Sequence, residues 1–281
     1  MTSGTFLDRI LPETRKDLED RKQRVPFSGL EAWLEKAPKV QDFKAALTGP
    51  EVKLISEIKK ASPSKGQFVE KLDVAALARL YAKNGAAAIS VLTDAPFFQG
   101  SLEDMSVART VAAMWELPVL RKDFIVDPYQ ILESRVWGAD AILLIVAVLE
   151  QKELIEYINL ARQLGMEPLV ETHTEEEIHV ALSSGANVIG INNRDLSTFN
   201  TDLETTMVLA NNIPKEKIIV SESGISTAQH VKKLKGVGVN AVLVGEALIT
   251  ATDSSEKVRE LTGQSGRSRL PGLDEPQDKE G

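Results

Sequence analysis

The chain has 281 residues, of which 43% are hydrophobic and 26% are charged, and its formal net charge is −8. This composition is typical of a folded globular protein that is long enough to bury a full core. The sequence contains no cysteine, which excludes disulfides and cysteine nucleophiles, and its three scattered histidines form no zinc-binding pair, so we expect neither a metal nor another cofactor. The acidic balance argues against a nucleic acid or an acidic membrane as the main partner.

The first part of the chain is charged and lacks a secretory apolar segment. No uninterrupted apolar stretch of about 18 residues occurs further along. We therefore expect a cytoplasmic protein with no membrane partner. Residues 1–50 have the pattern of two or three helices, which we expect to form an extension packed on the bottom or rim of a larger domain.

The segment 54–66, LISEIKKASPSKG, is an apolar strand that ends in charged residues and breaks into a loop of serine, proline and glycine. Successive side chains on a strand point to opposite faces, so Glu57 and Lys59 share one face. Such charges cost free energy unless they are paired, solvated or used in catalysis. Because α/β enzymes place their chemistry at strand ends beside loops, we expect this segment to belong to an active site.

A unit of one helix, one glycine and one apolar strand then recurs four times. Glycine is favoured at that place because it accepts the left-handed conformation that ends a helix. Three more strand candidates follow helical patterns, LPVLRKDF, MEPLVETH and KIIVSESGI, so the total with the first strand is eight. The repeated glycines are Gly85, Gly138, Gly185 and Gly238, and the predicted helices lie at 73–84, 101–114, 127–137, 150–164, 174–184, 201–212, 226–235 and 254–262.

Alternating strands and helices imply parallel strands with right-handed crossovers. Eight such units in about 200 residues fit a closed (β/α)8 barrel, which we place at residues 51–262. An open doubly wound sheet is the alternative, but no GxGxxG follows the first strand, and polar residues end nearly every strand rather than one switch point. Residues 263–281 are polar and rich in glycine and proline, and we expect a disordered tail there.

In such a barrel the side chains at the carboxyl ends of the strands point into one shared cavity. A charge at one strand end is ordinarily a solvated rim residue, but charges on five different strands favour a functional pocket. The residues at or just after the strand ends are Glu57, Lys59, Thr93, Phe97, Phe98, Lys122, Leu143, Glu171, Asn192, Arg194, Glu222, Ser223 and Gly245.

The loops after strands seven and eight of such barrels commonly bind phosphate through backbone amides. Gly224 and Gly245 fit this role, because glycine lets the backbone approach an anion closely, and Ser62 in the first loop is a third candidate. The alternative is that both glycines only serve tight turns. Glu246 would repel a phosphate if its carboxylate faced inward, so we expect it to point away.

The order of these motifs resembles the indole-3-glycerol phosphate synthase family. The segment EIKKASPSKG is the most specific part, and the match continues from about residue 54 to about residue 249. The helical segment before the barrel also fits the family. The later matching motifs are LTDAPFFQGSLED, PVLRKDFIVDPYQ, GADAILLIV, EPLVETH, GINNRDL and VSESGI.

The resemblance implies closure of the indole ring of 1-(2-carboxyphenylamino)-1-deoxyribulose 5-phosphate, with loss of carbon dioxide and water, in tryptophan biosynthesis. It implies that Lys122 is the general acid that protonates the developing oxyanion. Glu171, Lys59 and Glu57 match the positions that serve dehydration, and how they divide the proton transfers stays open.

Substrate binding is implied for the remaining residues. Lys59 and Arg194 would bind the substrate carboxylate, which suits the planar fork of arginine, although Asp195 is a competing partner. Asn192 and Glu222 would hold sugar hydroxyls or orient the lysines, and three apolar residues would accept the anthranilate ring. The expected catalytic residues are Glu57, Lys59, Lys122, Glu171, Asn192, Glu222 and Ser223, and the expected substrate-binding residues are Ser62, Phe98, Phe124, Leu143, Arg194, Gly224, Gly245 and Glu246.

Other interpretations stay open from the residues alone. A phosphoribosyl-anthranilate isomerase would call for a catalytic cysteine, and neither it nor a tryptophan synthase α chain supplies EIKKASPSKG. A catalytically silent scaffold barrel would lack the charged strand ends. We interpret all three histidines as structural or surface residues, although His173 lies on the same face as Glu171. We expect a monomer that binds a small phosphorylated molecule, and association with other tryptophan-pathway enzymes stays open.

Overall fold

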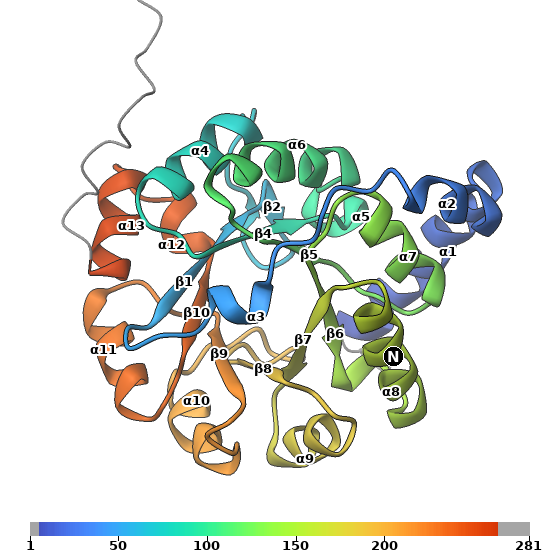
Figure 1. Ribbon diagram of the computed structural model, residues 1–281. Helices are drawn as coiled ribbons and strands as arrows, with labels where there is room; N and C mark the ends of the chain where they lie inside the picture. The colour runs from blue at the N-terminus through green and yellow to red at the C-terminus, as the bar shows by residue number, and fades with distance from the viewer. Residues whose placement is uncertain (1–5, 264–281) are drawn as a thin grey trace, which may run out of the picture.

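The protein contains a closed barrel of eight parallel strands with helices around it, as the computed structural model of residues 6–263 shows (Figure 1). The predicted (β/α)8 barrel is confirmed, and the open doubly wound sheet is wrong. The strands follow chain order around the ring, and β1 closes it by pairing with both the second and the last strand. The barrel strands are β1 (Lys53–Ile58), β4 (Ala88–Leu92), β5 (Val119–Lys122), β6 (Ala141–Ile145), β7 (Glu167–Thr172), β8 (Val188–Asn192), β9 (Ile218–Glu222) and β10 (Ala241–Val244).

The predicted helices form on the outside of this ring. Six of them begin after an Asp, Ser or Thr whose side chain accepts a hydrogen bond from a first-turn amide. The four repeated glycines have φ angles between 85° and 103°, which turns the chain back into the next strand. The helices are α4 (Val74–Lys83), α6 (Leu102–Ala112), α7 (Pro128–Val136), α8 (Gln151–Gln163), α9 (Glu175–Ser183), α10 (Glu204–Leu209), α11 (Ala228–Gly236) and α13 (Ser254–Thr262).

Both faces of the barrel strands are buried, which explains their continuous apolar sequences. Alternate side chains point inward and fill the barrel, among them Ile55 and Leu169. The side chains between them, such as Leu54 and Val170, point outward and pack under the helices. The barrel is therefore a solid scaffold, and the ends of its strands are held in fixed positions.

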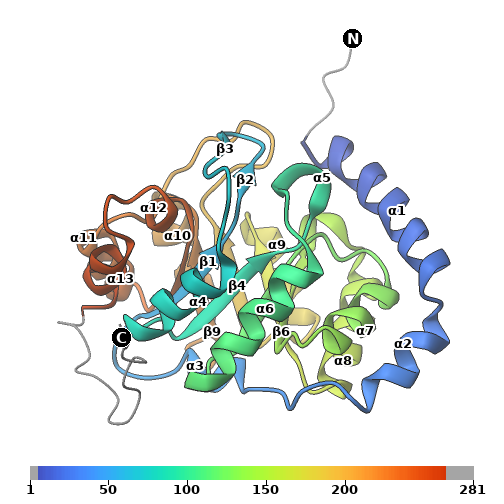
Figure 2. The same ribbon diagram turned by 90° about the horizontal axis from the view of Figure 1, so that it is seen from above.

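Three further helices precede the barrel: α1 (Phe6–Arg24), α2 (Phe27–Leu34) and α3 (Phe43–Ala46). Figure 2 shows α1 beside α7 and α8, and α3 at the end of the barrel opposite the β2–β3 hairpin. The buried side chain of Phe43 joins the core inside the barrel, so α3 closes the bottom. Phe6, at the start of α1, lies at the rim.

The first helix is fastened to the barrel by charge as well as by apolar packing. Leu18 packs with Tyr129 and Leu132 of α7. Arg21 forms an ion pair with the buried Glu133. Glu133 also accepts a hydrogen bond of 3.0 Å from Arg121, whose guanidinium is completely buried behind β5. A buried arginine needs such partners because desolvation of its charge is costly.

Some details differ from the sequence prediction. The loop after β1 folds into the hairpin of β2 (Ala61–Ser62) and β3 (Gly66–Gln67). The helix α10 starts three residues later than predicted, because Thr201 pairs with Arg194 in a β-bridge. Further short elements are α5 (Ala95–Phe98), α12 (Glu246–Ile249) and the 3-10 turns η1 (Ala113–Trp115), η2 (Val146–Val148) and η3 (Ala210–Asn212).

None of the helices between residues 6 and 263 combines the length and the apolar character that crossing a membrane requires. The tail predicted at 263–281 lies outside the described residues, apart from Gly263.

The α3 plug gives a stability prediction. Phe43 is 1% exposed, so Phe43→Ala should leave a cavity at the bottom of the barrel and lower the free energy of unfolding by about 3–5 kcal/mol. Phe27→Ala is the matched control, since Phe27 belongs to the same extension but is 46% exposed and should cost less than about 1 kcal/mol. Urea unfolding measures both values. Equal losses would show that α3 does not close the barrel.

Candidate active site

A cavity of about 570 Å³ opens at the carboxyl ends of the barrel strands. Every residue that the sequence predicts to be catalytic or to bind substrate lines it, because parallel strands bring all their carboxyl ends to one side of the ring. The lining residues that the sequence predicted are Glu57, Lys59, Ser62, Phe98, Lys122, Phe124, Leu143, Glu171, Asn192, Arg194, Glu222, Ser223, Gly224, Gly245 and Glu246.

The centre of the pocket is the ammonium group of Lys122, at the end of β5. It donates a hydrogen bond of 2.9 Å to Oε2 of Glu171 on β7, and its Nζ lies 3.2 Å from Oε2 of Glu222 on β9. Asn192, which ends β8 between them, donates to the other oxygen of Glu171 at 3.1 Å. The arrangement holds one cation between two carboxylates that are 1–2% exposed.

Burial and charge set the pKa values of this cluster. Burial lowers the pKa of Lys122, but the two carboxylates outweigh it and raise the pKa above its ordinary value. Burial raises the pKa of Glu171, but Lys122 and His173 bring it down to about 2. Burial also raises the pKa of Glu222, and repulsion from Glu171 leaves it at about 7 despite Lys122. Two carboxyls beside one lysine therefore differ in protonation at neutral pH.

Unequal packing accounts for this difference. Within residues 6–263, Oε1 of Glu222 is buried and has no hydrogen-bond partner. A Cβ atom on Gly190 would lie 2.3 Å from this oxygen, so only glycine at that place on β8 leaves room for it. A protonated carboxyl has a hydroxyl to donate and a smaller desolvation cost.

A second cation–carboxylate pair lies on the first strand. Nζ of Lys59 is 2.7 Å from Oε1 of Glu57, so the predicted pairing on one strand face is observed. The ammonium also lies 5.7 Å from the ring centre of Phe68. A Cβ atom on Gly245 would come within 2.2 Å of Oε1 of Glu57. Gly245 therefore leaves room for the carboxylate of Glu57, a use of this glycine that its place at a strand end does not indicate.

One wall of the pocket is apolar. Phe98, Phe124 and Leu143 lie there as predicted. Two further aromatic residues, Phe6 of α1 and Phe199 after β8, also line the pocket and pack edge-to-face at 5.0 Å. The local sequence around Phe6 carries no signal for this place, because nothing in it connects the first helix to a cavity formed by the barrel strands.

The rim carries a network of charges. Nη1 of Arg194 donates a hydrogen bond of 3.1 Å to Ser64 in the β2–β3 hairpin, and Nη2 lies 3.6 Å from Glu246. Lys65, in the same hairpin, lies 3.8 Å from the other oxygen of Glu246. The expectation that Glu246 points away from the pocket is therefore wrong, because these two rim cations attract its carboxylate.

The loop after β9 turns through two successive left-handed residues, Ser223 with a φ angle of 68° and Gly224 with a φ angle of 76°. Both line the pocket together with Gly245 and Ser62. A Cβ atom on Gly224 would also clash with Thr201 at 2.6 Å, so the turn needs glycine for its own geometry. The hydroxyl of Ser62 is buried and has no hydrogen-bond partner among the described residues.

Two of the strand-end residues, Thr93 and Phe97, do not line the pocket. The hydroxyl of Thr93 instead donates to Asp123 at 2.6 Å behind β5. Of the two expected kinds of place for a histidine, structural or surface, His173 has the structural one, since its side chain is 13% exposed and its Nε2 lies 3.5 Å from Oε1 of Glu171. The signal for this contact in the sequence is the position of His173 two residues after Glu171, on the same strand face.

The fold and the pocket define a class of protein: a (β/α)8-barrel enzyme that transfers protons on a small anionic substrate. A family model described as indole-3-glycerol phosphate synthase matches residues 7–261. A protein of that name from Roseiflexus sp. (strain RS-1) is 51% identical over 267 residues, which cover 93% of this chain and 99% of that protein. Another of that name from Dehalococcoides mccartyi (strain ATCC BAA-2266 / KCTC 15142 / 195) is 50% identical over 257 residues, covering 91% and 99%.

The chain belongs to the indole-3-glycerol phosphate synthase family. It is a carboxy-lyase that closes the indole ring of the phosphorylated carboxyphenylamino substrate in tryptophan biosynthesis, as the motif order predicts. The alternatives of a different phosphate-binding barrel enzyme and of a silent scaffold are wrong.

Solved structures of other barrel enzymes resemble the fold alone. A 3-hexulose-6-phosphate synthase matches with a TM-score of 0.60 at 13% identity, covering 75% of this chain and 99% of that one. The tryptophan synthase α2β2 complex from the hyperthermophile Pyrococcus furiosus contains a chain that matches with a TM-score of 0.54 at 17% identity, covering 75% and 98%.

The unequal carboxyls give a prediction that needs no substrate. With ¹³C-labelled glutamate, the NMR signal of Glu222 should titrate near pH 7, because its folded pKa is raised to about 7. Glu171 should stay ionised between about pH 5 and pH 9, because Lys122 and His173 stabilise its charge. Glu222→Gln should remove the titration near neutrality. Titration of both carboxyls in the ordinary acidic range would contradict the proposed difference.

Proposed function

We propose that Lys122 is the general acid of ring closure. As the ring carbon that carries the carboxylate bonds to the ketone carbon, the electron pair of the carbonyl moves to oxygen, and Lys122 gives that oxygen a proton. The observation that supports this role is the position of its ammonium group, between Glu171 and Glu222 and facing the pocket. These carboxylates keep the lysine charged and aimed at one point.

Dehydration falls to the remaining acid and base groups. After carbon dioxide has left, the new hydroxyl must depart as water, so it must receive a proton while a base removes one from the ring. Lys59, paired with Glu57, is the second proton donor, and Glu171 is the base. The two lysines approach the substrate from different strands, β5 and the end of β1. With a separate proton donor for each step, Lys122 does not have to be protonated again before dehydration.

Three parts of the pocket bind the substrate. Arg194 and Lys59 hold its carboxylate, since the planar guanidinium suits a bidentate partner. Ser62, Gly224 and Gly245 form the phosphate end, where the backbone can approach the anion closely. Ser223 orients this turn, and Glu246 releases Arg194 when the substrate carboxylate replaces it. The apolar wall accepts the anthranilate ring, and its residues are Phe98, Phe124 and Leu143.

The β2–β3 hairpin contributes to closure of the site. Ser64 and Lys65 already reach Arg194 and Glu246 across the pocket mouth. We propose that the loop from Lys60 to Leu72 moves over the bound substrate and excludes water, which strengthens the electrostatic interactions inside.

We also propose that the protein works in the cytoplasm as a monomer. The pocket is lined by residues of one chain and needs no second copy to complete it. Size-exclusion chromatography with light scattering should give a mass near the 30.7 kDa of one chain. A mass of two chains at micromolar concentration would contradict the monomer.

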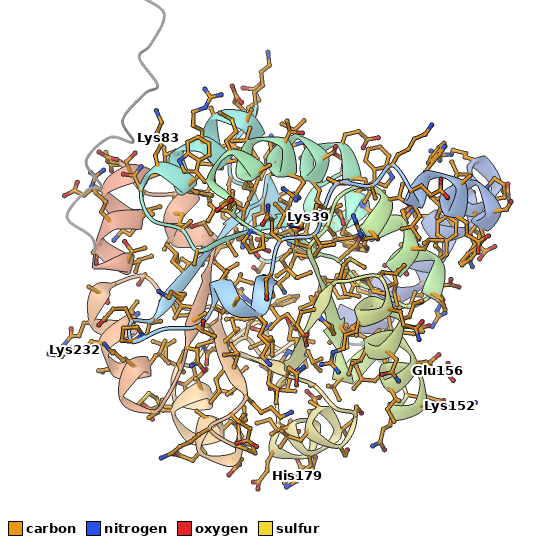
Figure 3. The ribbon with its side chains drawn as sticks, in the orientation of Figure 1. Lys39, Lys83, Lys152, Glu156, His179 and Lys232 are labelled. Carbon is orange, nitrogen blue, oxygen red and sulfur yellow. The ribbon has the colours of Figure 1, made fainter. Side chains whose placement is uncertain are left out.

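The general-acid role is tested by following the fluorescence of the indole product. Lys122→Ala should lower kcat by roughly 10²–10⁴-fold, the usual contribution of a positioned general acid. Lys152→Ala is the matched control, because Lys152 is a fully solvated lysine that points away from the barrel (Figure 3). It should leave kcat and KM unchanged.

A second variant, in the same assay, tests a residue that is proposed to bind the substrate and not to take part in proton transfer. Arg194→Ala should raise KM by about tenfold and change kcat little, because a charge-assisted contact to the substrate carboxylate is lost in ground and transition states alike.

If Lys122→Ala kept wild-type kcat, the acid would have to be another residue. If purified wild type formed no indole product, the activity itself would be refuted.

A further inference from the structure

His173 stands directly behind Glu171, on the side away from Lys122. It follows β7, and its Nε2 lies 3.5 Å from Oε1 of Glu171, whereas Lys122 contacts Oε2. Its Nδ1 lies 3.2 Å from Oε2 of Glu177, in the first turn of α9. That same carboxylate oxygen accepts the backbone N–H of His173. The ring is therefore fixed between two carboxylates, one on each side.

The surroundings of the two ring nitrogens determine the protonation of His173. Each nitrogen faces a carboxylate oxygen, and a carboxylate can only accept a hydrogen bond. Nδ1 is within hydrogen-bond distance of Glu177, whereas Nε2 is buried, has no hydrogen-bond partner among residues 6–263 and faces Oε1 of Glu171 at the ion-pair distance of 3.5 Å. Two anionic neighbours favour the imidazolium form of the ring. Burial lowers the pKa of His173, but Glu177 and Glu171 outweigh it and raise the pKa above its ordinary value.

The charge of His173 can stabilise Glu171 during the step in which Lys122 loses its own charge. Lys122 becomes neutral when it gives its proton to the ketone oxygen, and at that moment Glu171, which is 2% exposed, loses its cationic partner. A buried carboxylate without a partner takes up a proton or moves. His173 contacts the other oxygen and is not consumed by this step.

We propose that His173 is a positioning residue that keeps Glu171 ionised and in place while Lys122 donates its proton. This inference rests on the proposed roles of Lys122 and Glu171. Glu177 holds the imidazolium from α9, and Asn192 fixes Oε1 of Glu171 from β8. Glu171 is thus supported from behind by His173 and Glu177, neither of which lines the active-site pocket.

Several charged groups face His173 and enter its titration. Glu171 lies on its own strand, Glu177 on α9, and Glu222 acts from β9. On the other side, His173 lines a cavity of about 580 Å³ between the loops after β7 and β8, together with Asp195 and Asp202. All of these groups are acidic, so each favours the imidazolium.

Steady-state kinetics of His173→Gln tests the role. The neutral amide keeps the size but removes the charge, so kcat should fall by about tenfold with KM changed less than about twofold. The acidic limb of the kcat profile should shift to higher pH, because the pKa of Glu171 rises without the cation. Above the pKa of His173 the wild type also lacks this charge, so the two enzymes should converge there.

His179→Gln is the matched control, because His179 lies on the exposed face of α9 and points to solvent (Figure 3). It should match wild type at every pH. If His173→Gln also matched wild type in kcat and in its pH profile, the positioning role would be overturned.

A direct titration does not depend on activity or on the folding of His173→Gln. The NMR pKa of the His173 ring should lie above the ordinary histidine value in wild type and fall in Glu171→Gln, since one of its two anions is gone. An unchanged ring pKa would overturn the pairing.

The same Glu171→Gln variant distinguishes a failure of the proposed function of Glu171 from a failure of the inference about His173. If it kept full activity, the role of Glu171 as base would fail. If it were inactive while His173→Gln behaved as wild type, the inference about His173 alone would fail.

Discussion

The active site depends on one constraint: the ammonium group of a largely buried lysine must be kept charged. Lys122 meets it by lying between Glu171 and Glu222, at 2.9 and 3.2 Å. Two carboxylates beside one cation cannot both be stabilised as anions, so the pKa of Glu171 falls and that of Glu222 rises. One cluster thus holds a charged lysine, an ionised carboxylate and a carboxyl whose pKa lies near neutrality.

The (β/α)8 barrel stabilises this cluster of charges because it holds the members at fixed positions on separate rigid strands. Glu57, Lys122, Glu171 and Glu222 come from four strands whose other side chains fill the solid core below. Charged groups held in place need no reorganisation when charge develops on the substrate. Glycine supports the same purpose, since Gly245 leaves room for the carboxylate of Glu57. Scaffold and chemistry therefore use the same strand ends.

The extension before the barrel acts at both ends of it. Phe43 closes the bottom, whereas Phe6 reaches the substrate pocket and packs against Phe199. The buried contact between Arg21 and Glu133 fastens the helix that joins these two regions. The spacing of apolar and charged residues along a helix predicts which side chains are buried or exposed. It does not predict which distant segment a buried side chain contacts. For this reason the extension was expected on the bottom or rim, and its aromatic contribution to the pocket was not foreseen.

The sequence by itself determined the barrel, its strand ends and the family, because strand and helix periodicities are local and the seven motifs stand in a fixed order. The period of two along a strand was enough to pair Glu57 with Lys59, and all residues expected to be catalytic or to bind substrate line one pocket. Only the tertiary structure decided how charges on different strands interact. It turned Glu246 toward the rim cations and brought His173 behind Glu171, because distances between separate strands and loops set both contacts.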